Sequence, residues 1–545
     1  MINLHLYKEQ KTTTFETSEM SNFLIEQMKH NILIGLLISF FAIGCKVANE
    51  QSTGATETSS KPNIIFVYFD DLGYGDVSAN GAKDFQTPNL DGLANGGVNF
   101  TNGYASSATC TPSRYAAFTG HYPWKKELKI LPGTAPLIID TAQVTMPKML
   151  QEAGYNTAII GKWHMGLGDA NKDWNKHISP GPNEVGFDYS YILAATQDRV
   201  PTVYIEDGNV VNLDPNDPIE IDYKNNFEGQ PTGKDNPELT TMKWHHGHNA
   251  TIINGVPRIG YMKGGKSAIW SDVDMADHFL DGVKSYITEK SKEDKPFFLA
   301  YTMQQPHVPR TPHPRFVGKS GKGPRGDVIM EADWCIGELM KTIREAGIEE
   351  NTLIIVSSDN GPVLNDGYYD DAVELNGDHK PAGPYRGGKY SLFEAGTHVP
   401  FFTYWKGTIE PGVSDALVCQ IDLFSSLATL VGSDMRGPDS EDVMDAFLGK
   451  STKGRESLIL EATTRTSYRK GDFILIPPYK GAKVNKQVNI ELGNLKHVAL
   501  FNVKEDPSQT KNLAKENPEL VKEMMEEFLA KKGNYGRKIQ QLELK

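Results

Sequence analysis

Residues 62–76 read PNIIFVYFDDLGYGD, a short apolar run that ends in two carboxylates. The run Ile64–Phe69 has the β-branched and aromatic composition of a strand buried on both faces. Three later stretches repeat the pattern of an apolar run followed by polar groups: 157–164 (TAIIGKWH), 296–307 (PFFLAYTMQQPH) and 353–361 (LIIVSSDNG). Because such runs alternate with helical patterns, the sequence predicts an α/β fold with a large, mostly parallel sheet flanked by helices.

Oxygen-bearing side chains follow two of these strands, at Asp70, Asp71, Asp359 and Asn360. The carboxyl ends of parallel strands meet at one edge of a sheet, where ligands bind. Hard oxygen ligands suit Ca²⁺, or less well Mg²⁺, and not zinc. Three carboxylates gathered without a cation would raise one another's pKa, so a metal-free acidic cluster is the costlier alternative. We therefore expect one divalent cation, preferably Ca²⁺.

A second set of candidates is cationic or imidazole-bearing. Taken singly, each lysine is more simply a solvated charge, and each histidine a packed residue. Together, and next to a metal ion, they would neutralise an anionic transition state. The set comprises Arg114, Lys162, Lys389, His164 and His307.

Residues 106–120 read SSATCTPSRYAAFTG and contain one cysteine. Pro112 and Ser113 suit a helix start, which would put Cys110 at the positive end of the helix dipole. A nucleophilic thiolate normally needs a nearby histidine and a depressed pKa, and the nearest histidine in sequence is His121. A buried, inert thiol is the commoner fate of a free cysteine.

The run CTPSR, followed by TG, resembles the signature of the type I sulfatases, arylsulfatase A-like members of the alkaline phosphatase superfamily. The stretches NIIFVYFDDLGYGD, GKWHMG, QPHVP, SSDNG and RGGKYSLFEAGTHVP also match motifs of this family. The resemblance extends from about residue 61 to the end of the chain. His398 and Tyr385 depart from it, because many members carry Arg and Leu at these positions.

The resemblance implies a sulfuric ester hydrolase in which Cys110 is oxidised to Cα-formylglycine (3-oxoalanine) by a maturation enzyme. It implies that the hydrated aldehyde attacks sulfur, with Asp359 as activating base. It also implies that His307, with Lys389, protonates the departing alcohol, and that His164 deprotonates the second hydroxyl to expel sulfate. The implied catalytic residues are Cys110, Arg114, Lys162, His164, His307 and Lys389, and the implied metal ligands are Asp70, Asp71, Asp359, Asn360 and residue 110.

The amino-terminal part predicts export. Residues 28–45, MKHNILIGLLISFFAIGC, have a basic start and an apolar run too short to span a membrane comfortably, as in a secretory signal. The ending resembles a bacterial lipoprotein box with Cys45 as the lipidated residue; a plain signal peptide is the first alternative and a retained anchor helix the second. We expect residues 1–27 to be a mis-assigned start, with Met28 as the true start and Met20 as the alternative. The Ser/Thr-rich residues 46–61 would form a tether. We expect a periplasmic or outer-membrane location, with membrane contact only through the lipid.

Composition limits the remaining possibilities. The net charge of −13, without a long basic run, argues against nucleic acid as a partner. Cys335 and Cys419 would be separate buried thiols or, less simply, a disulfide. We expect a catalytic domain over 62–435 and a C-terminal α+β subdomain over 436–545, with an antiparallel sheet and one helix. The weakly periodic residues 171–269, with His245, His246 and His248, would form loops over the site.

The sequence therefore predicts removal of sulfate from a sulfated poly- or oligosaccharide. A sulfatase of small aryl sulfates is one alternative. A phosphate or phosphonate ester hydrolase is another, although Cys110 disfavours it, since such relatives carry Ser or Thr as nucleophile and often bind two metal ions. A carbohydrate-binding pseudoenzyme would require a broken catalytic set, and every expected member is present.

Overall fold

The computed structural model describes residues 61–539. The structure does not describe residues 1–60, which include the predicted signal segment, Cys45 and nearly all of the tether. The predictions made for these residues therefore stay predictions. Within the described range, no helix combines the length and the apolar character needed to cross a bilayer.

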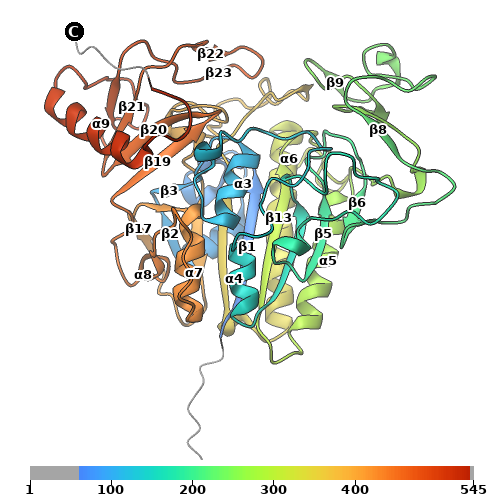
Figure 1. Ribbon diagram of the computed structural model, residues 1–545, viewed down its shortest axis with the longest axis horizontal. Coiled ribbons are helices and arrows are strands. Elements are labelled where there is room, and N and C mark those ends of the chain that lie inside the picture. The colour runs from blue at the N-terminus through green and yellow to red at the C-terminus, as the bar shows by residue number, and fades with distance from the viewer. Residues whose placement is uncertain (1–60, 540–545) are drawn as a thin grey trace, which may run out of the picture. The chain divides into compact units, whose positions relative to one another are not determined.

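A ten-stranded sheet forms the centre of the fold (Figure 1). Its five middle strands are parallel, and the flanking strands are mostly antiparallel, so the predicted mostly parallel sheet is confirmed. The order is β17 (Gly412–Ser414), β2 (Val98–Phe100), β16 (Phe401–Tyr404), β14 (Thr352–Ser358), β1 (Asn63–Asp70), β13 (Phe297–Pro306), β4 (Asn156–Lys162), β5 (Tyr189–Leu193), β6 (Tyr204–Glu206) and β7 (Asn209–Val210).

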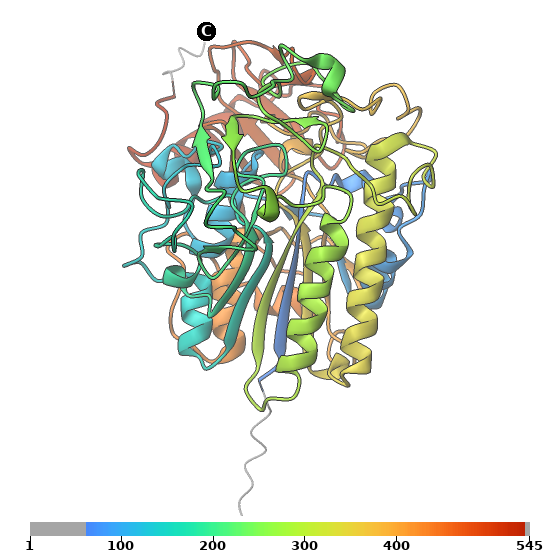
Figure 2. The same ribbon diagram turned by 90° about the vertical axis from the view of Figure 1, so that its right-hand side faces the viewer.

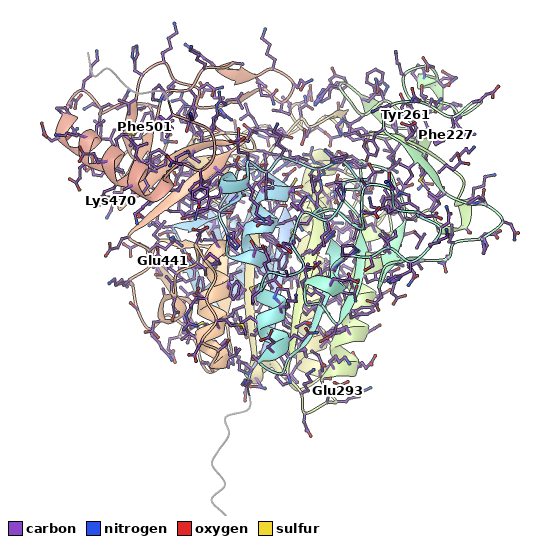
Figure 3. The ribbon with its side chains drawn as sticks, viewed as in Figure 1. Phe227, Tyr261, Glu293, Glu441, Lys470 and Phe501 are labelled. Carbon is purple, nitrogen blue, oxygen red and sulfur yellow. The ribbon has the colours of Figure 1, made fainter. Side chains whose placement is uncertain are left out.

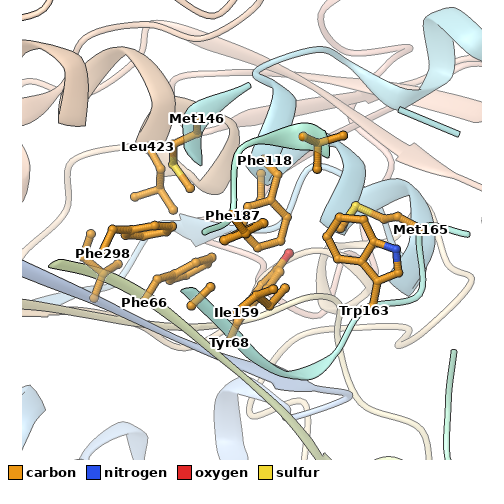
Figure 4. Close-up of a cluster of buried hydrophobic side chains, with 14 of the residues drawn as sticks. Phe66, Tyr68, Phe118, Met146, Ile159, Trp163, Met165, Phe187, Phe298 and Leu423 are labelled. Atoms are coloured by element: carbon orange, nitrogen blue, oxygen red, sulfur yellow. The ribbon is translucent and has the colours of Figure 1, made fainter. Parts of the chain in front are cut away.

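Helices cover both faces of this sheet, which explains why all eight residues of β1 are buried (Figures 1 and 2). Side chains from β1 and the facing helices interdigitate, as Phe66 and Phe118 do with ring centroids 6.4 Å apart (Figure 4). One layer contains α2 (Pro88–Gly96), α5 (Met275–Lys290) and α6 (Gly323–Glu345); the other contains α3 (Cys110–Thr119), α4 (Met146–Glu152), α7 (Leu423–Val431) and α8 (Met444–Phe447).

The long helix α6 begins at Gly323, whereas the apolar periodicity of its sequence, with Ile336, Leu339 and Ile343 on one face, is confined to its second half. Its first turns bury polar groups that such a pattern cannot include. Arg325 donates two hydrogen bonds to Asp76, and Asp327 accepts bonds from the backbone of Gly318 and Ser320. The apolar run LFSSLATLV forms α7.

The segment 171–269 is less loop-like than its composition suggests. It supplies β5, which extends the parallel part of the central sheet, and the antiparallel strands β6 and β7. These strands are short and lie among Asp, Gly and Pro residues, so the sequence shows no extended apolar alternation from which to predict them. Short two-stranded ribbons fill much of the rest: β8 (Glu220–Asp222) with β12 (Tyr261–Lys263), β10 (Ile252–Ile253) with β11 (Val256–Pro257), and β9 (Lys243–Trp244) with β15 (Tyr368–Tyr369).

The C-terminal subdomain has the expected antiparallel sheet and single long helix. Its strands are β19 (Ser457–Ala462), β20 (Arg465–Lys470), β21 (Phe473–Ile476) and β24 (Ala499–Asn502). Helix α9 (Pro518–Lys532) begins at a proline, as helices often do. Strand β20 was not predicted, because its sequence RTSYRK is polar although five of its six residues are buried. The two short ribbons β3 (Gly103–Tyr104) with β18 (Val418–Cys419) and β22 (Val484–Asn485) with β23 (Ile490–Glu491) complete the strands.

The carboxyl ends of the parallel strands lie between the C-terminal subdomain and the 171–269 segment. In Figure 3, Phe501 and Lys470 of the subdomain and Phe227 and Tyr261 of the segment lie at this end of the sheet, whereas Glu293, in the loop before β13, lies at the opposite end. The C-terminal subdomain and the 171–269 segment therefore both border the region in which the predicted site residues lie.

Candidate active site

The four predicted strand ends converge. Strand β1 ends at Asp70 and β4 ends at Lys162, while Asp359 directly follows β14. His307 directly follows β13, whose Pro306 pairs with Asp70. Every predicted site residue is at most 4% exposed: Asp70, Asp71, Cys110, Arg114, Lys162, His164, His307, Asp359, Asn360 and Lys389.

Cys110 is the first residue of α3, two positions before the start expected from Pro112. Thr109 before it is extended, and all ten residues of the helix are buried. Burial raises the pKa of the Cys110 thiol even though the charges of Lys162 and Lys389 act to lower it. The unmodified side chain is therefore a neutral thiol at neutral pH, which does not suit it to thiolate chemistry.

The acidic set has the properties of a cation site. Asn360 Nδ2 donates to Asp71 Oδ1 at 2.6 Å, and the backbone N–H of Asp71 approaches Asp359 Oδ1 at 3.4 Å. Burial raises the pKa of Asp70 and Asp71, and the charge of Asp359 raises both further. Among the described residues, Asp70 Oδ1 and Asn360 Oδ1 are buried without any hydrogen-bond partner. Two unpartnered oxygens among crowded carboxylates fit a hard divalent cation.

His307 lies at the edge of this acidic set. One ligand atom each from Asp70, Asp71 and His307 can be chosen so that all three lie within 4.8 Å of one another. Its Nδ1 is 2.7 Å from the carbonyl oxygen of Val308, which leaves Nε2 directed to the site, 3.9 Å from Asp71 Oδ2. Burial, and then the charge of Lys389, hold the His307 pKa well below its usual value. A bound anion would raise that pKa again.

Two cations link the acidic set to the start of α3. Arg114 Nε donates to Asp359 Oδ2 at 2.8 Å and its Nη1 donates to the carbonyl of Lys162 at 3.0 Å. Lys162 bonds Asp70 and lies 3.7 Å from Asp359 Oδ2. Arg114 Nη2 is buried and has no partner within the described part of the chain, so a strong donor is available to an anionic ligand.

Lys389 lies between two carboxylates, with Nζ 2.9 Å from both Asp71 Oδ2 and Asp366 Oδ2. Although burial lowers its pKa, the charges of Asp366 and Asp71 raise it well above the usual value, so this ammonium stays charged. Asp366 was missed by sequence reasoning, because it lies in the run NDG, which is typical of a turn. Only its position opposite Lys389 identifies it.

His164 has the geometry of a base. Its Nε2 is 3.0 Å from the carbonyl oxygen of Leu131, and its Nδ1 is buried without a partner among residues 61–539. Burial and the neighbouring Lys162 lower its pKa well below the usual value, so the ring is neutral. His164 (φ 58°), Asp71 (φ 66°) and Tyr390 (φ 75°) have left-handed backbones, a strained conformation that is often found at functional sites.

A model of the sulfatase family matches residues 62–433. The chain belongs to the sulfatase family. An N-acetylgalactosamine-6-O-sulfatase of Bacteroides thetaiotaomicron is 48% identical over 89% of this chain and 95% of that protein. Human arylsulfatase A is 30% identical over 73% of this chain and 70% of that protein. This sulfatase is accordingly a sulfuric ester hydrolase.

A solved structure from a study of glycosaminoglycan metabolism by Bacteroides thetaiotaomicron superposes on the sulfatase with a TM-score of 0.85. Its sequence identity is 48%, and the match covers 87% of this chain and 99% of that chain. The match therefore includes the C-terminal subdomain as well as the central sheet.

Three residues of the 171–269 segment, Asp198, Arg199 and His248, form a polar wall beside the site of the sulfatase. Asp198 accepts hydrogen bonds from Arg199 Nη1 at 2.8 Å and pairs with His248 Nε2 at 2.8 Å. The neighbouring Gln197 links this run to the site, because its backbone N–H donates to Oε1 of Gln304, three residues before His307, at 3.4 Å. His245 and His246 contact each other instead through their Nδ1 atoms, 2.7 Å apart. In the described part of the chain, the histidines of this segment do not form a metal-ligand group.

Replacing Lys389 with Ala is expected to lower kcat by about 10²–10³-fold on any sulfate ester, because a buried cation next to the site is lost. Steady-state kinetics would measure this. Lys380→Ala, which removes an exposed lysine of the same loop, is the matched control and should leave kcat unchanged. A Lys389→Ala enzyme with wild-type kcat would show that Lys389 only neutralises Asp366 and Asp71.

Proposed function

We propose that this sulfatase removes 6-O-sulfate from N-acetylgalactosamine residues in a sulfated poly- or oligosaccharide, using formylglycine made from Cys110 and one Ca²⁺ ion. The observation that carries the substrate proposal is the 48% identity to an N-acetylgalactosamine-6-O-sulfatase across nearly the full length of both chains. The Arg199–Asp198–His248 wall supports it, because it gives a sugar ring polar partners beside the site.

The residues around Cys110 fit a formylglycine at this position and a Ca²⁺ ion beside it. A hydrated aldehyde at position 110 would supply the oxygen nucleophile, and a cation held by Asp70, Asp71, Asp359 and Asn360 would supply positive charge against the sulfate oxygens. Arg114 offers its free Nη2, and Lys162 and Lys389 add two buried positive charges. These donors are fixed before substrate arrives, which favours stabilisation of charge in the transition state.

Two histidines would move the protons. His307 presents Nε2 towards the site, where a proton on that atom can pass to the departing alcohol oxygen. His164 presents an unpartnered, neutral Nδ1, which can accept a proton when sulfate is released. Asp359, whose pKa stays low beside Arg114 despite burial, is an ionised carboxylate bonded to Arg114, one helical turn after residue 110, and can accept the proton of the attacking hydroxyl.

The proposal includes an exported enzyme. Residues 28–45 support a signal ending at a lipidated Cys45, and a formylglycine-generating enzyme is the maturation partner. Mass spectrometry of the mature amino terminus from the native host tests the first point, since an unlipidated Cys45 or a retained residue 28 would contradict it.

The substrate proposal is tested with a matched panel at equal concentrations. The panel holds 6-sulfated N-acetylgalactosamine, 6-sulfated N-acetylglucosamine, an aryl sulfate and 6-phosphorylated N-acetylgalactosamine. We expect kcat/KM to be highest for the first by about tenfold or more, because the wall can discriminate one hydroxyl orientation. Arg199→Ala should remove this preference while sparing the aryl sulfate. Highest turnover of the aryl sulfate would overturn the carbohydrate proposal, and highest turnover of the phosphate would favour the phosphate ester hydrolase.

A further inference from the structure

The hairpin formed by β19 and β20 brings the C-terminal subdomain into contact with the segment that precedes Cys110. Glu461 forms a parallel bridge with Ser107. The N–H of Ala108 donates to the carbonyl of Glu461 at 2.7 Å, and the N–H of Glu461 donates to the carbonyl of Ser106 at 3.1 Å. The last residue of this bonded stretch, Ala108, lies two positions before Cys110.

The Glu461 side chain reinforces the same contact. Its carboxylate accepts a hydrogen bond from Ser107 Oγ and another from the N–H of Thr464. Ser107 Oγ in turn accepts from the N–H of Thr109 at 3.2 Å. Thr109 is the residue before α3 and has no side-chain cap of its own, so this chain of contacts supports the start of the helix.

The other strand of the hairpin reaches the segment that carries Lys389. Arg465 Nη2 donates to the carbonyl of Tyr390 at 2.9 Å, and the N–H of Tyr390 donates to the carbonyl of Ala108 at 2.8 Å. Tyr390 follows Lys389 directly and has a positive φ. Ala108 is therefore held between Glu461 on one side and Tyr390 on the other.

The turn that joins the two strands is strained. Thr463 (φ 50°) and Thr464 (φ 71°) are consecutive β-branched residues with left-handed backbones, which is costly for such side chains. Glu461 and Arg465 are also buried, at 1% and 3% exposure, and burial shifts their pKa values to about 7 and about 10. Strain and buried charge persist only where the surrounding contacts compensate for them.

We propose that the tip of the β19–β20 hairpin is a positioning element of the active site, in which Glu461 and Arg465 hold the segments of Cys110 and Lys389 at a fixed separation. Neither residue touches the reacting atoms; Glu461 acts through Ser107 and Arg465 acts through Tyr390. The inference rests on the proposed roles of Cys110 and Lys389, but not on the identity of the sugar.

The test measures kcat and KM on an aryl sulfate at a temperature far below the Tm of each variant. The kcat is divided by the fraction of chains that carry the modification at residue 110. Ser107→Ala removes only the hydroxyl that joins Glu461 to Thr109 and leaves the backbone pairing in place. We expect Ser107→Ala and Glu461→Ala each to lower kcat by about tenfold with KM changed less than about twofold, because a small misplacement of a reacting group affects the chemical step.

The double variant and a conservative variant separate positioning from folding. Ser107→Ala combined with Glu461→Ala should be no slower than the slower single variant, because both remove one chain of contacts. Glu461→Gln, a close mimic of the uncharged acid, should keep at least about half of kcat. Arg465→Lys, which loses the planar fork at Tyr390, should lower kcat by several-fold. Glu456→Gln, an exposed change just before β19, should have no effect.

Several outcomes would overturn the inference. Wild-type kcat in folded Ser107→Ala and Glu461→Ala, with only a lower Tm, would make the hairpin purely structural. Multiplicative effects in the double variant, or a Glu461→Gln enzyme as slow as Glu461→Ala, would contradict the route through Ser107. A wild-type enzyme that does not turn over the aryl sulfate would instead count against the proposed catalytic function, so the two failures are distinguishable.

Discussion

Cys110→Ser is expected to abolish sulfate-ester hydrolysis, with a loss of at least about 10³-fold in kcat, while the fold stays intact. Serine is close to cysteine in size, so the first turn of α3 should be unchanged. A serine, however, has only one hydroxyl. Sulfate transferred to it would form a stable ester, because no second hydroxyl is available for His164 to deprotonate.

The measurement combines turnover of an aryl sulfate with thermal unfolding and mass spectrometry of the peptide that contains residue 110. Cys335→Ser is the matched control, since Cys335 is another free, buried thiol, on α6 and outside the site. It should keep wild-type kcat. Turnover by Cys110→Ser within tenfold of the wild type would contradict the proposed chemistry, as would an unmodified thiol in a fully active wild-type preparation.

Removing the cation is expected to have the second largest effect. Chelation should lower Tm and abolish turnover, because Asp70, Asp71 and Asp359 would then be buried together without a compensating ion. Ca²⁺ at about 100 times its Kd should stabilise the fold by about 2.7 kcal/mol. Mg²⁺ should restore less, since it demands a tighter octahedral shell than this mixed carboxylate and amide set offers.

Calorimetric titration of the chelated protein with Ca²⁺ and Mg²⁺, followed by thermal unfolding, checks this expectation without relying on activity. In Asp70→Asn, one ligand charge is lost, so added Ca²⁺ should no longer raise Tm. Asp378→Asn, which changes an exposed carboxylate, should respond to Ca²⁺ as the wild type does. A wild-type Tm that does not respond to millimolar Ca²⁺ would exclude the proposed site.

Much of this arrangement could be predicted from the sequence, because parallel strands bring their carboxyl ends together. The apolar runs before Asp70, Lys162, His307 and Asp359 were enough to group these residues, and the structure places the runs as neighbouring strands β1, β4, β13 and β14. The separate thiols Cys335 and Cys419 are confirmed, since both are free and buried. The roles of the site residues remain predictions.

What could not be predicted depends on contacts between distant segments. Asp366 gives no signal as the partner of Lys389, because a polar turn residue is ordinary until its neighbour is known. Strand β20 escaped notice because its arginines are buried by hydrogen bonds and not by apolar contacts; Arg469 bonds Glu394, and Arg465 bonds Tyr390. Periodicity detects apolar burial only.

The burial of α3 bears on the order in which this chain could be modified and folded. Cys110 is only 1% exposed, so no other protein can reach its sulfur without opening of the fold. The oxidation of Cys110 that we propose would therefore have to precede the folding of this region. On this proposal, faster folding would lower the yield of active molecules, so the folding rate would matter to activity as well as the final stability.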